Sequence, residues 1–174
     1  MQIRLLALAP FALTLMGAET APDALSLEGS WTMDSAYEIL ANGTRTTNYG
    51  EHPSGLMIID HAGRYSIQIF RRDRPPFKSG DKTRGTPEEY RTAVLGSSTH
   101  FGRVNIDREK HQLLFDVESA SFPNWEGKRQ VRDYVFRDGL LTYSVPASAS
   151  GNAAARSYWN TCCCRNPDSC CRSG

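Results

Sequence analysis

Hydrophobic and polar residues alternate along much of the chain between residues 27 and 160. The clearest case is the segment 64–70, in which Tyr65, Ile67 and Ile69 fall on one face. Ser66 and Gln68 fall on the opposite face. A period of two residues is typical of a strand that is buried on one side. We therefore expect a chain built mainly of short β-strands.

Turn signals separate these strand-like segments. Asn42-Gly43 and Asp138-Gly139 favour the tight turns of β-hairpins. The segment from Thr44 to Asn48 is either a short return strand or a loop. The other predicted strands are Trp31 to Leu40, Leu56 to Ile59, Arg64 to Phe70, His100 to Ile106, Gln112 to Glu118, Gln130 to Arg137, Leu140 to Val145 and Ala154 to Asn160.

One helix interrupts the strands, after the third or fourth of them. It follows a polar loop from Arg71 to Gly85. Thr86 can cap the helix, and Pro87 suits its first turn. Glu89 completes a capping box, in which two side chains satisfy free N–H groups reciprocally. We expect the helix to end by Gly96.

Short strands joined by tight turns are typical of an antiparallel barrel or a sandwich. Consecutive hairpins favour the barrel, because closure removes exposed sheet edges and leaves room for one small ligand. We therefore predict an all-β fold, an antiparallel up-and-down barrel of eight strands over residues 27–160. A sandwich is the alternative.

The N-terminal segment 1–18 resembles a secretory signal peptide. Arg4 precedes an apolar stretch from Leu5 to Met16, and the small residues Gly17 and Ala18 follow it. This order of charge, apolar stretch and small residues is typical of export signals. We expect the mature protein to be secreted or periplasmic.

The segment 161–174 contains all five cysteines of the chain. They are Cys162, Cys163, Cys164, Cys170 and Cys171. An odd number leaves at least one thiol unpaired within the chain, or paired with another chain. Their spacing does not match the usual four-ligand zinc sites. We expect a disordered tail and assign no metal site; how the thiols pair is left open.

Composition and motifs exclude several classes of function. The net charge of +1 comes without a basic stripe, so no nucleic-acid partner is expected. No apolar run reaches the roughly 18 residues of a membrane-spanning helix. The nucleophile, zinc and phosphate-loop motifs of common enzymes are missing, so we assign no cofactor and no catalytic residue.

Carboxylates and histidines are the remaining candidates for acid–base chemistry. A carboxylate can act in this way if it is desolvated, and the candidates are Asp73, Asp116, Glu118 and Asp133. The histidines have no metal-ligand spacing, and each is expected in a turn or at the surface. They are His52, His61, His100 and His111.

Six motifs follow one another between residues 29 and 127. They are Gly29-Ser30-Trp31, the YGEHPSGL of residues 49–56, the RDRPPF of 72–77, the GTPEEY of 85–90, the FGR of 101–103 and the SFPNWEG of 121–127. In order and spacing they resemble motifs of the bacterial and fungal lipocalin-like domain proteins. The resemblance implies a lipocalin-like barrel with one internal pocket, but no particular function, because one fold hosts many functions.

The chain departs from this family in one strand. Members often carry a histidine where this chain reads Leu113 to Val117, and here His111 precedes that segment. No catalytic role that depends on that histidine is carried over.

The loops that carry these motifs are the predicted mouth of the pocket. Aromatic side chains with a few fixed polar groups are typical of small-molecule sites. Trp31 is expected instead to pack at the closed end of the barrel. The predicted ligand-binding residues are Tyr49, His52, Arg72, Asp73, Arg74, Phe77, Phe122 and Trp125.

Three arginines lie in or beside strands: Arg103, Arg129 and Arg132. An inward arginine could bind a carboxylate through two parallel hydrogen bonds. An outward arginine is an ordinary solvated charge, and we expect this orientation for all three. The orientation of Gln68 and Tyr134 is left open, because a shift of one residue in register exchanges the two faces of a strand.

The resulting hypothesis is an exported barrel that binds a small hydrophobic or amphipathic molecule. It requires an internal cavity, for which about 300 Å³ is the usual lower size. The alternative is an isomerase or cyclase that acts by confining a reactive substrate. A third hypothesis is an interaction role in which tail thiols link chains. Ligand identity, enzymatic activity and oligomeric state are left open.

Overall fold

The computed structural model describes residues 25–40, 42–145 and 155–161. The predicted signal peptide and the cysteines of the tail lie outside these residues.

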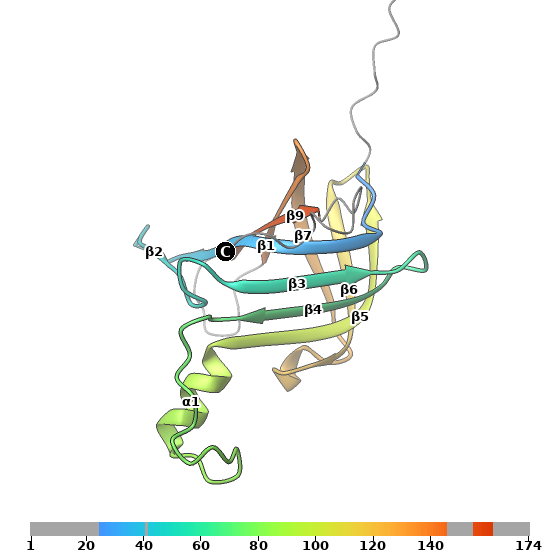
Figure 1. Ribbon diagram of the computed structural model, residues 1–174. Helices are drawn as coiled ribbons and strands as arrows, with labels where there is room; N and C mark the ends of the chain where they lie inside the picture. The colour runs from blue at the N-terminus through green and yellow to red at the C-terminus, as the bar shows by residue number, and fades with distance from the viewer. Residues whose placement is uncertain (1–24, 41, 146–154, 162–174) are drawn as a thin grey trace, which may run out of the picture.

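Eight antiparallel strands close into a barrel (Figure 1). Each strand pairs with the next one along the barrel, and β9 pairs with β1 to complete the ring. The eight strands are β1 (Gly29–Ile39), β3 (Ser54–Ile59), β4 (Arg64–Phe70), β5 (Ser97–Asp107), β6 (Gln112–Ala120), β7 (Arg129–Arg137), β8 (Leu140–Val145) and β9 (Ala155–Thr161). The short β2 (Arg45–Thr46) pairs with the end of β1. The predicted up-and-down barrel of eight strands is confirmed.

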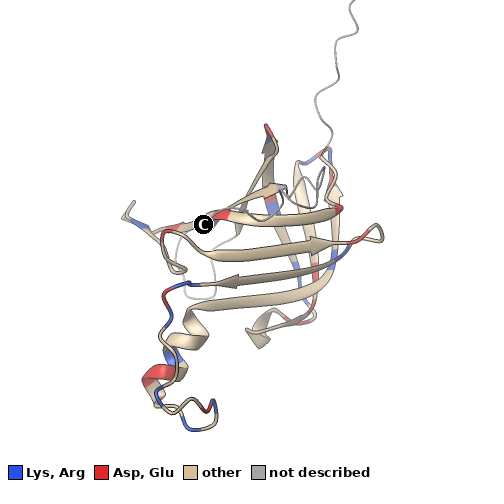
Figure 2. Ribbon diagram, in the orientation of Figure 1, with Lys and Arg blue, Asp and Glu red and all other residues tan. Residues whose placement is uncertain are grey.

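The helix α1 (Pro87–Leu95) lies between β4 and β5, within the predicted interval. Its capping box is formed as expected: the Glu89 amide donates to Thr86 Oγ1, and the Thr86 amide donates to Glu89 Oε2 at 2.7 Å. The helix projects from one end of the barrel, and none of its residues is buried (Figure 1). Charged residues recur along the helix and the loop before it (Figure 2). The helix therefore adds nothing to the core.

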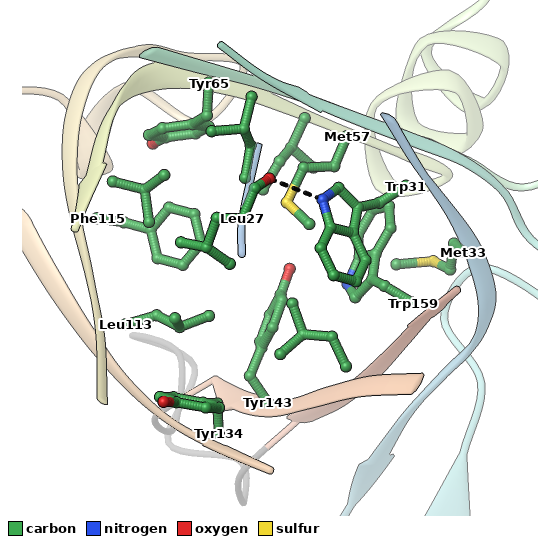
Figure 3. Close-up of a cluster of buried hydrophobic side chains, with 14 of the residues drawn as sticks. Leu27, Trp31, Met33, Met57, Tyr65, Leu113, Phe115, Tyr134, Tyr143 and Trp159 are labelled. Carbon is green, nitrogen blue, oxygen red and sulfur yellow. Dashed lines mark hydrogen bonds between the residues drawn. The ribbon is translucent and has the colours of Figure 1, made fainter. Parts of the chain in front are cut away.

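One end of the barrel is filled by apolar side chains. Leu25 and Leu27 precede β1 and are buried there with Trp31. The indole Nε1 of Trp31 donates to the Leu27 carbonyl oxygen at 2.9 Å (Figure 3). The Trp31 ring also meets the ring of Phe136 edge-on at 6.3 Å. These contacts confirm that Trp31 packs into the core.

The opposite end carries the longer connections, which span residues 40–53, 71–96 and 121–128. The short 3-10 helix η1 (Pro123–Trp125) belongs to the third of them. Polar side chains are buried in the barrel, and they lie on the strand segments that approach this end. They are Ser98, His100, Arg132 and Ser157. The interior thus changes from apolar to polar along the barrel axis.

Two expected orientations are wrong. His100, expected in a turn or at the surface, is buried at 4% exposure on β5. Arg132, expected to face solvent, is buried at 3% exposure on β7. Tyr134 is buried on the same face of β7, whereas Val135 faces outward at 60% exposure. Side chains alternate across a strand, so the inward position of Tyr134 requires Arg132 to point inward too.

The other two strand arginines face outward, as expected. Arg129 is exposed and forms an ion pair with Asp116 at 2.6 Å. Arg103 is exposed and donates to the Ala62 carbonyl oxygen. Arg132 is therefore the one strand arginine of the three that the barrel encloses.

A bulge in β6 lies beside the buried histidine. Phe101 pairs with Ser119, but Gly102 pairs with Val117, which leaves Glu118 as an extra residue. A Cβ on Gly102 would overlap the backbone oxygen of Asp116. Glycine at this position therefore permits the close approach of β5 and β6, two residues from His100.

Candidate ligand-binding cavity

A cavity of about 190 Å³ lies inside the barrel, at the end that carries the long connections. Its inner wall consists of buried side chains: Ala36, Ile69, Ser98, His100, Arg132, Tyr143 and Ser157. Its rim consists of partly or fully exposed side chains: Tyr37, Glu38, Asn48, Tyr49, Trp125 and Val145. We call the buried set the floor and the exposed set the rim. The cavity therefore extends from the loops into the barrel.

The cavity is smaller than the expected size. Its volume of about 190 Å³ lies below the roughly 300 Å³ at which pockets for drug-sized molecules begin. An apolar cavity of about 150 Å³ in a protein core can hold benzene. The cavity is therefore large enough for one aromatic ring with a small substituent, or for a short aliphatic chain.

His100 is held on the floor by aromatic neighbours. Its Nδ1 lies 2.9 Å from the hydroxyl oxygen of Tyr65, and its ring meets that of Trp125 edge-on at 5.7 Å. Burial, together with the nearby charge of Arg132, lowers the pKa of His100 from 6.5 to about 3; burial makes the larger contribution. The imidazole is therefore neutral at physiological pH, with one nitrogen able to donate a hydrogen bond and one able to accept.

We expect this histidine to make the barrel less stable in mild acid. The folded pKa is about 3, below the 6.5 or so of an unfolded histidine, so the unfolded chain binds the extra proton. The free energy of unfolding is highest above about pH 6.5 and decreases toward pH 3. Between pH 7 and pH 5 it should fall by about 2 kcal/mol. Urea unfolding at these two pH values measures the loss.

His100→Gln is the control, because glutamine keeps hydrogen-bonding groups and does not titrate. The variant should lose much less stability than the parent between pH 7 and pH 5. An equal loss in both proteins would show that other groups cause the pH dependence.

Arg132 carries a buried charge with few compensating contacts. Its guanidinium lies over the rings of Phe115 and Tyr143, at 4.4 and 5.0 Å from their centres. Nη2 donates to Gln130 Oε1 at 2.6 Å, whereas Nε has no hydrogen-bond partner among the described residues. No ion pair in the described part of the chain includes Arg132.

These contacts offset only part of the cost of burying the charge. A cation over an aromatic ring gains about 0.5 to 2 kcal/mol. Removing an ion from water costs several kcal/mol even after the protein relaxes. The floor of the cavity is therefore a positively charged region that the described residues leave incompletely neutralised.

Tyr143 completes the polar part of the floor. Its side chain points into the barrel, as Figure 3 shows. Burial raises the pKa of Tyr143, while neighbouring Arg132, Trp159 and Ser157 lower it by smaller amounts. The hydroxyl is therefore neutral near pH 7. The indole Nε1 of Trp159 is buried and has no hydrogen-bond partner within the described segments.

Two of the predicted ligand-binding residues line the cavity: Tyr49 and Trp125. Burial raises the pKa of the Tyr49 hydroxyl, and a hydrogen bond with Ser98 partly lowers it. The ring of Phe122 meets that of Trp125 edge-on, with ring centres 5.6 Å apart. These three residues come from the connections 40–53 and 121–128 at one end of the barrel, and Phe122 does not line the cavity itself.

Other predicted residues line a separate groove on the outside of the barrel. His52, Arg72 and Asp73 are part of its wall, and Tyr49 lines it as well. The groove has a volume of about 980 Å³. Asp73 forms an ion pair with Arg71 at 2.7 Å, and this contact holds the pKa of Asp73 below its usual value. The structure thus places five of the predicted mouth residues in two separate hollows, and Arg74, Phe77 and Phe122 line neither.

The last two predicted residues hold the loop before the helix. Arg74 lies over the ring of Phe70 at 4.6 Å, and its Nε donates to the Arg71 carbonyl oxygen. The ring of Phe77 meets that of Tyr90 edge-on at 5.4 Å. In this structure both side chains order the loop and the helix. A ligand-binding role for the eight predicted residues stays a prediction.

The carboxylates considered for acid–base chemistry lie outside the cavity. Their partners are Arg71 for Asp73, Arg129 for Asp116, Arg64 for Glu118 and Gln112 for Asp133. The Arg129 guanidinium holds the pKa of Asp116 below its usual value. Within the described segments, no cluster of three or more potential metal ligands occurs. No helix there is both long and apolar enough to cross a membrane.

The floor of the cavity, above all His100, Arg132 and Tyr143, was not among the residues predicted from the sequence. A signal existed on β5, where Val104 is buried. Counting back from Val104 in steps of two places His100 and Ser98 on the same inward face. On β7 both faces carry bulky apolar residues, so the same counting does not determine which face, and hence whether Arg132, points into the barrel.

The closed barrel and the six sequence motifs agree with the protein family that the sequence matches. A family model described as a lipocalin-like domain matches residues 28–162, which is most of the chain. No curated protein matches the chain by sequence. The match covers all eight barrel strands and every residue of the cavity. The chain therefore belongs to the lipocalin-like domain family.

Proposed function

We propose that this protein binds a small amphipathic molecule in the cavity of the barrel. The proposal rests on the cavity of about 190 Å³, which is lined by both apolar and polar side chains. Ile69, Trp125 and Val145 offer apolar contacts, while Arg132 and Ser157 offer hydrogen-bond donors. A largely apolar site with a few placed polar groups is typical of small-molecule pockets.

Confinement chemistry is the alternative, as in an isomerase or cyclase. One observation favours it: the neutral His100 lines the cavity and contacts the Tyr65 hydroxyl, so the pair could carry a proton. A barrel that holds a substrate near its attack geometry accelerates a reaction without further catalytic groups. Conversion of a captured molecule into an isomer, detected by chromatography with mass spectrometry, would establish this alternative.

Native mass spectrometry tests the binding function. The purified protein is incubated with a metabolite extract, and the retained molecules are released and identified. We expect one class of small molecule to be retained at a stoichiometry near one per barrel. A barrel that retains nothing would contradict the proposal.

A pair of variants tests whether the retained molecule lies in the cavity. Ser98 faces the cavity, whereas its neighbour Thr99 faces outward. Ser98→Leu fills part of the cavity, so affinity should decrease at least about tenfold, equivalent to about 1.4 kcal/mol. Thr99→Leu adds a similar side chain outside and should leave affinity unchanged. Equal effects of the two changes would place the ligand elsewhere.

We also propose that the protein is exported. The charge at Arg4 followed by the apolar stretch from Leu5 to Met16 supports export. N-terminal sequencing of protein from the periplasm or the medium tests this. A mature chain that still begins before Arg4 would contradict removal of a signal peptide.

A further inference from the structure

We propose that the ligand of the cavity is a small monocarboxylate whose carboxylate pairs with Arg132. The inference rests on the proposed binding function and specifies the chemical class of the ligand. The observation that carries it is a guanidinium on the floor of the cavity, buried to 97% and without a counter-ion among the described residues.

The charge of Arg132 cannot be removed by deprotonation. A guanidinium remains protonated in proteins, unlike a buried lysine, which can lose its proton. The neighbouring floor groups are neutral: His100 and Tyr143 are both held in their uncharged forms by burial. Nothing on the described floor therefore supplies the negative charge that a buried cation requires.

Glu38 is the carboxylate among the described residues that line the cavity. It belongs to the rim, at the end of β1, and it is partly exposed. It forms no ion pair with Arg132 in the described structure. The cavity thus has a positive floor and one negative charge at its rim. This arrangement favours a ligand with a single negative charge that lies deep in the barrel.

Hydrogen-bond donors on the floor suit a carboxylate. Nε of Arg132 has no acceptor among the described residues, and the Tyr143 hydroxyl lies close to both the guanidinium and Ser157. Arginine binds a carboxylate through two parallel N–H···O bonds, which are stronger than bonds between neutral groups. An acid of this size would place its oxygens at Arg132 and its apolar part toward Ile69 and Trp125.

The cavity volume limits the apolar part. Because about 150 Å³ is enough for benzene, the 190 Å³ observed here is suitable for an acid as small as benzoate. Benzoate is therefore the probe, and benzamide is its neutral counterpart of nearly equal shape. Benzylamine, which is cationic near pH 7, is the probe of opposite charge.

Calorimetric titration of the full chain with these three probes tests the inference. We expect benzoate to bind at least about tenfold more tightly than benzamide, and benzylamine not to bind. Arg132→Met should abolish the preference for benzoate. Arg129→Met, which removes an outward arginine from the same strand, should keep it. Circular dichroism confirms that each variant retains the barrel.

The outcomes separate the inference from the function on which it rests. Equal affinity for benzoate and benzamide would overturn the carboxylate inference and leave binding in the cavity intact. A preference for benzoate that survives in Arg132→Met would also overturn it. If neither the probes nor a metabolite extract yields a bound molecule, the proposed binding function fails as well. The comparison of probes in the unmodified protein does not depend on the folding of any variant.

Discussion

Replacing Phe115 with alanine should lower the free energy of unfolding by about 3 to 5 kcal/mol. Phe115 lies on β6 at 0% exposure. Its ring meets that of Tyr65 edge-on at 4.9 Å and supports the guanidinium of Arg132 at 4.4 Å. The substitution removes buried apolar area, leaves a cavity and takes away one of the contacts that stabilise a buried charge.

A matched substitution isolates the effect of burial. Phe101 is a phenylalanine on the neighbouring strand β5, but its side chain is 44% exposed. Phe101→Ala should cost about 1 kcal/mol or less, within the range of strand propensities. Urea unfolding followed by circular dichroism measures both variants. Similar losses for the two phenylalanines would show that the Phe115 region is not the tightly packed part of the core.

Arg132→Met should raise the stability of the ligand-free protein, by about 1 to 4 kcal/mol. Methionine has a similar length and no charge, so the cost of burying the guanidinium disappears. The losses are the contacts with two aromatic rings and one hydrogen bond to Gln130. Removing a buried charge is usually destabilising because its partner is left unpaired. Arg132 has no carboxylate partner among the described residues, so this loss does not arise.

Two comparisons test this result. Arg132→Lys keeps a basic group that is buried either charged or after losing its proton, each at a cost in free energy, so it should bring a smaller gain in stability than Arg132→Met. Benzoate at one fixed concentration should raise the melting temperature of the parent protein more than that of Arg132→Met, because tighter binding to the folded state gives more stabilisation. A loss of stability in Arg132→Met would show that the ring contacts fully compensate the buried charge.

The sequence predicted the elements that local chemistry determines. Asn42-Gly43 forms the expected turn: Gly43 adopts a positive φ of 81°, and the Leu40 amide donates to the Thr44 carbonyl oxygen. Asp138 and Gly139 both adopt positive φ, as the favoured hairpin turn requires. The helix cap at Thr86 depends on residues within three positions. These signals need no knowledge of distant strands.

The part of the floor on β7 could not be predicted, because the face of that strand that points inward depends on pairing between strands. Val131 and Val135 are better strand-core candidates by composition than Arg132, yet both face outward. The register that pairs Arg132 with the buried Leu113 determines which face of β7 points inward. Barrel closure then brings β7 together with β1 and β5, which lie far away in the chain.

Tyr49 lines both the internal cavity and the outer groove. One side chain is therefore shared by two hollows that are otherwise lined by different residues. A molecule in the groove that displaces this ring also changes the space available in the cavity. Binding at the two places would then be linked, and each ligand would alter the affinity of the other by the same factor. A single tyrosine thus gives the barrel a structural basis for communication between its interior and its outer surface.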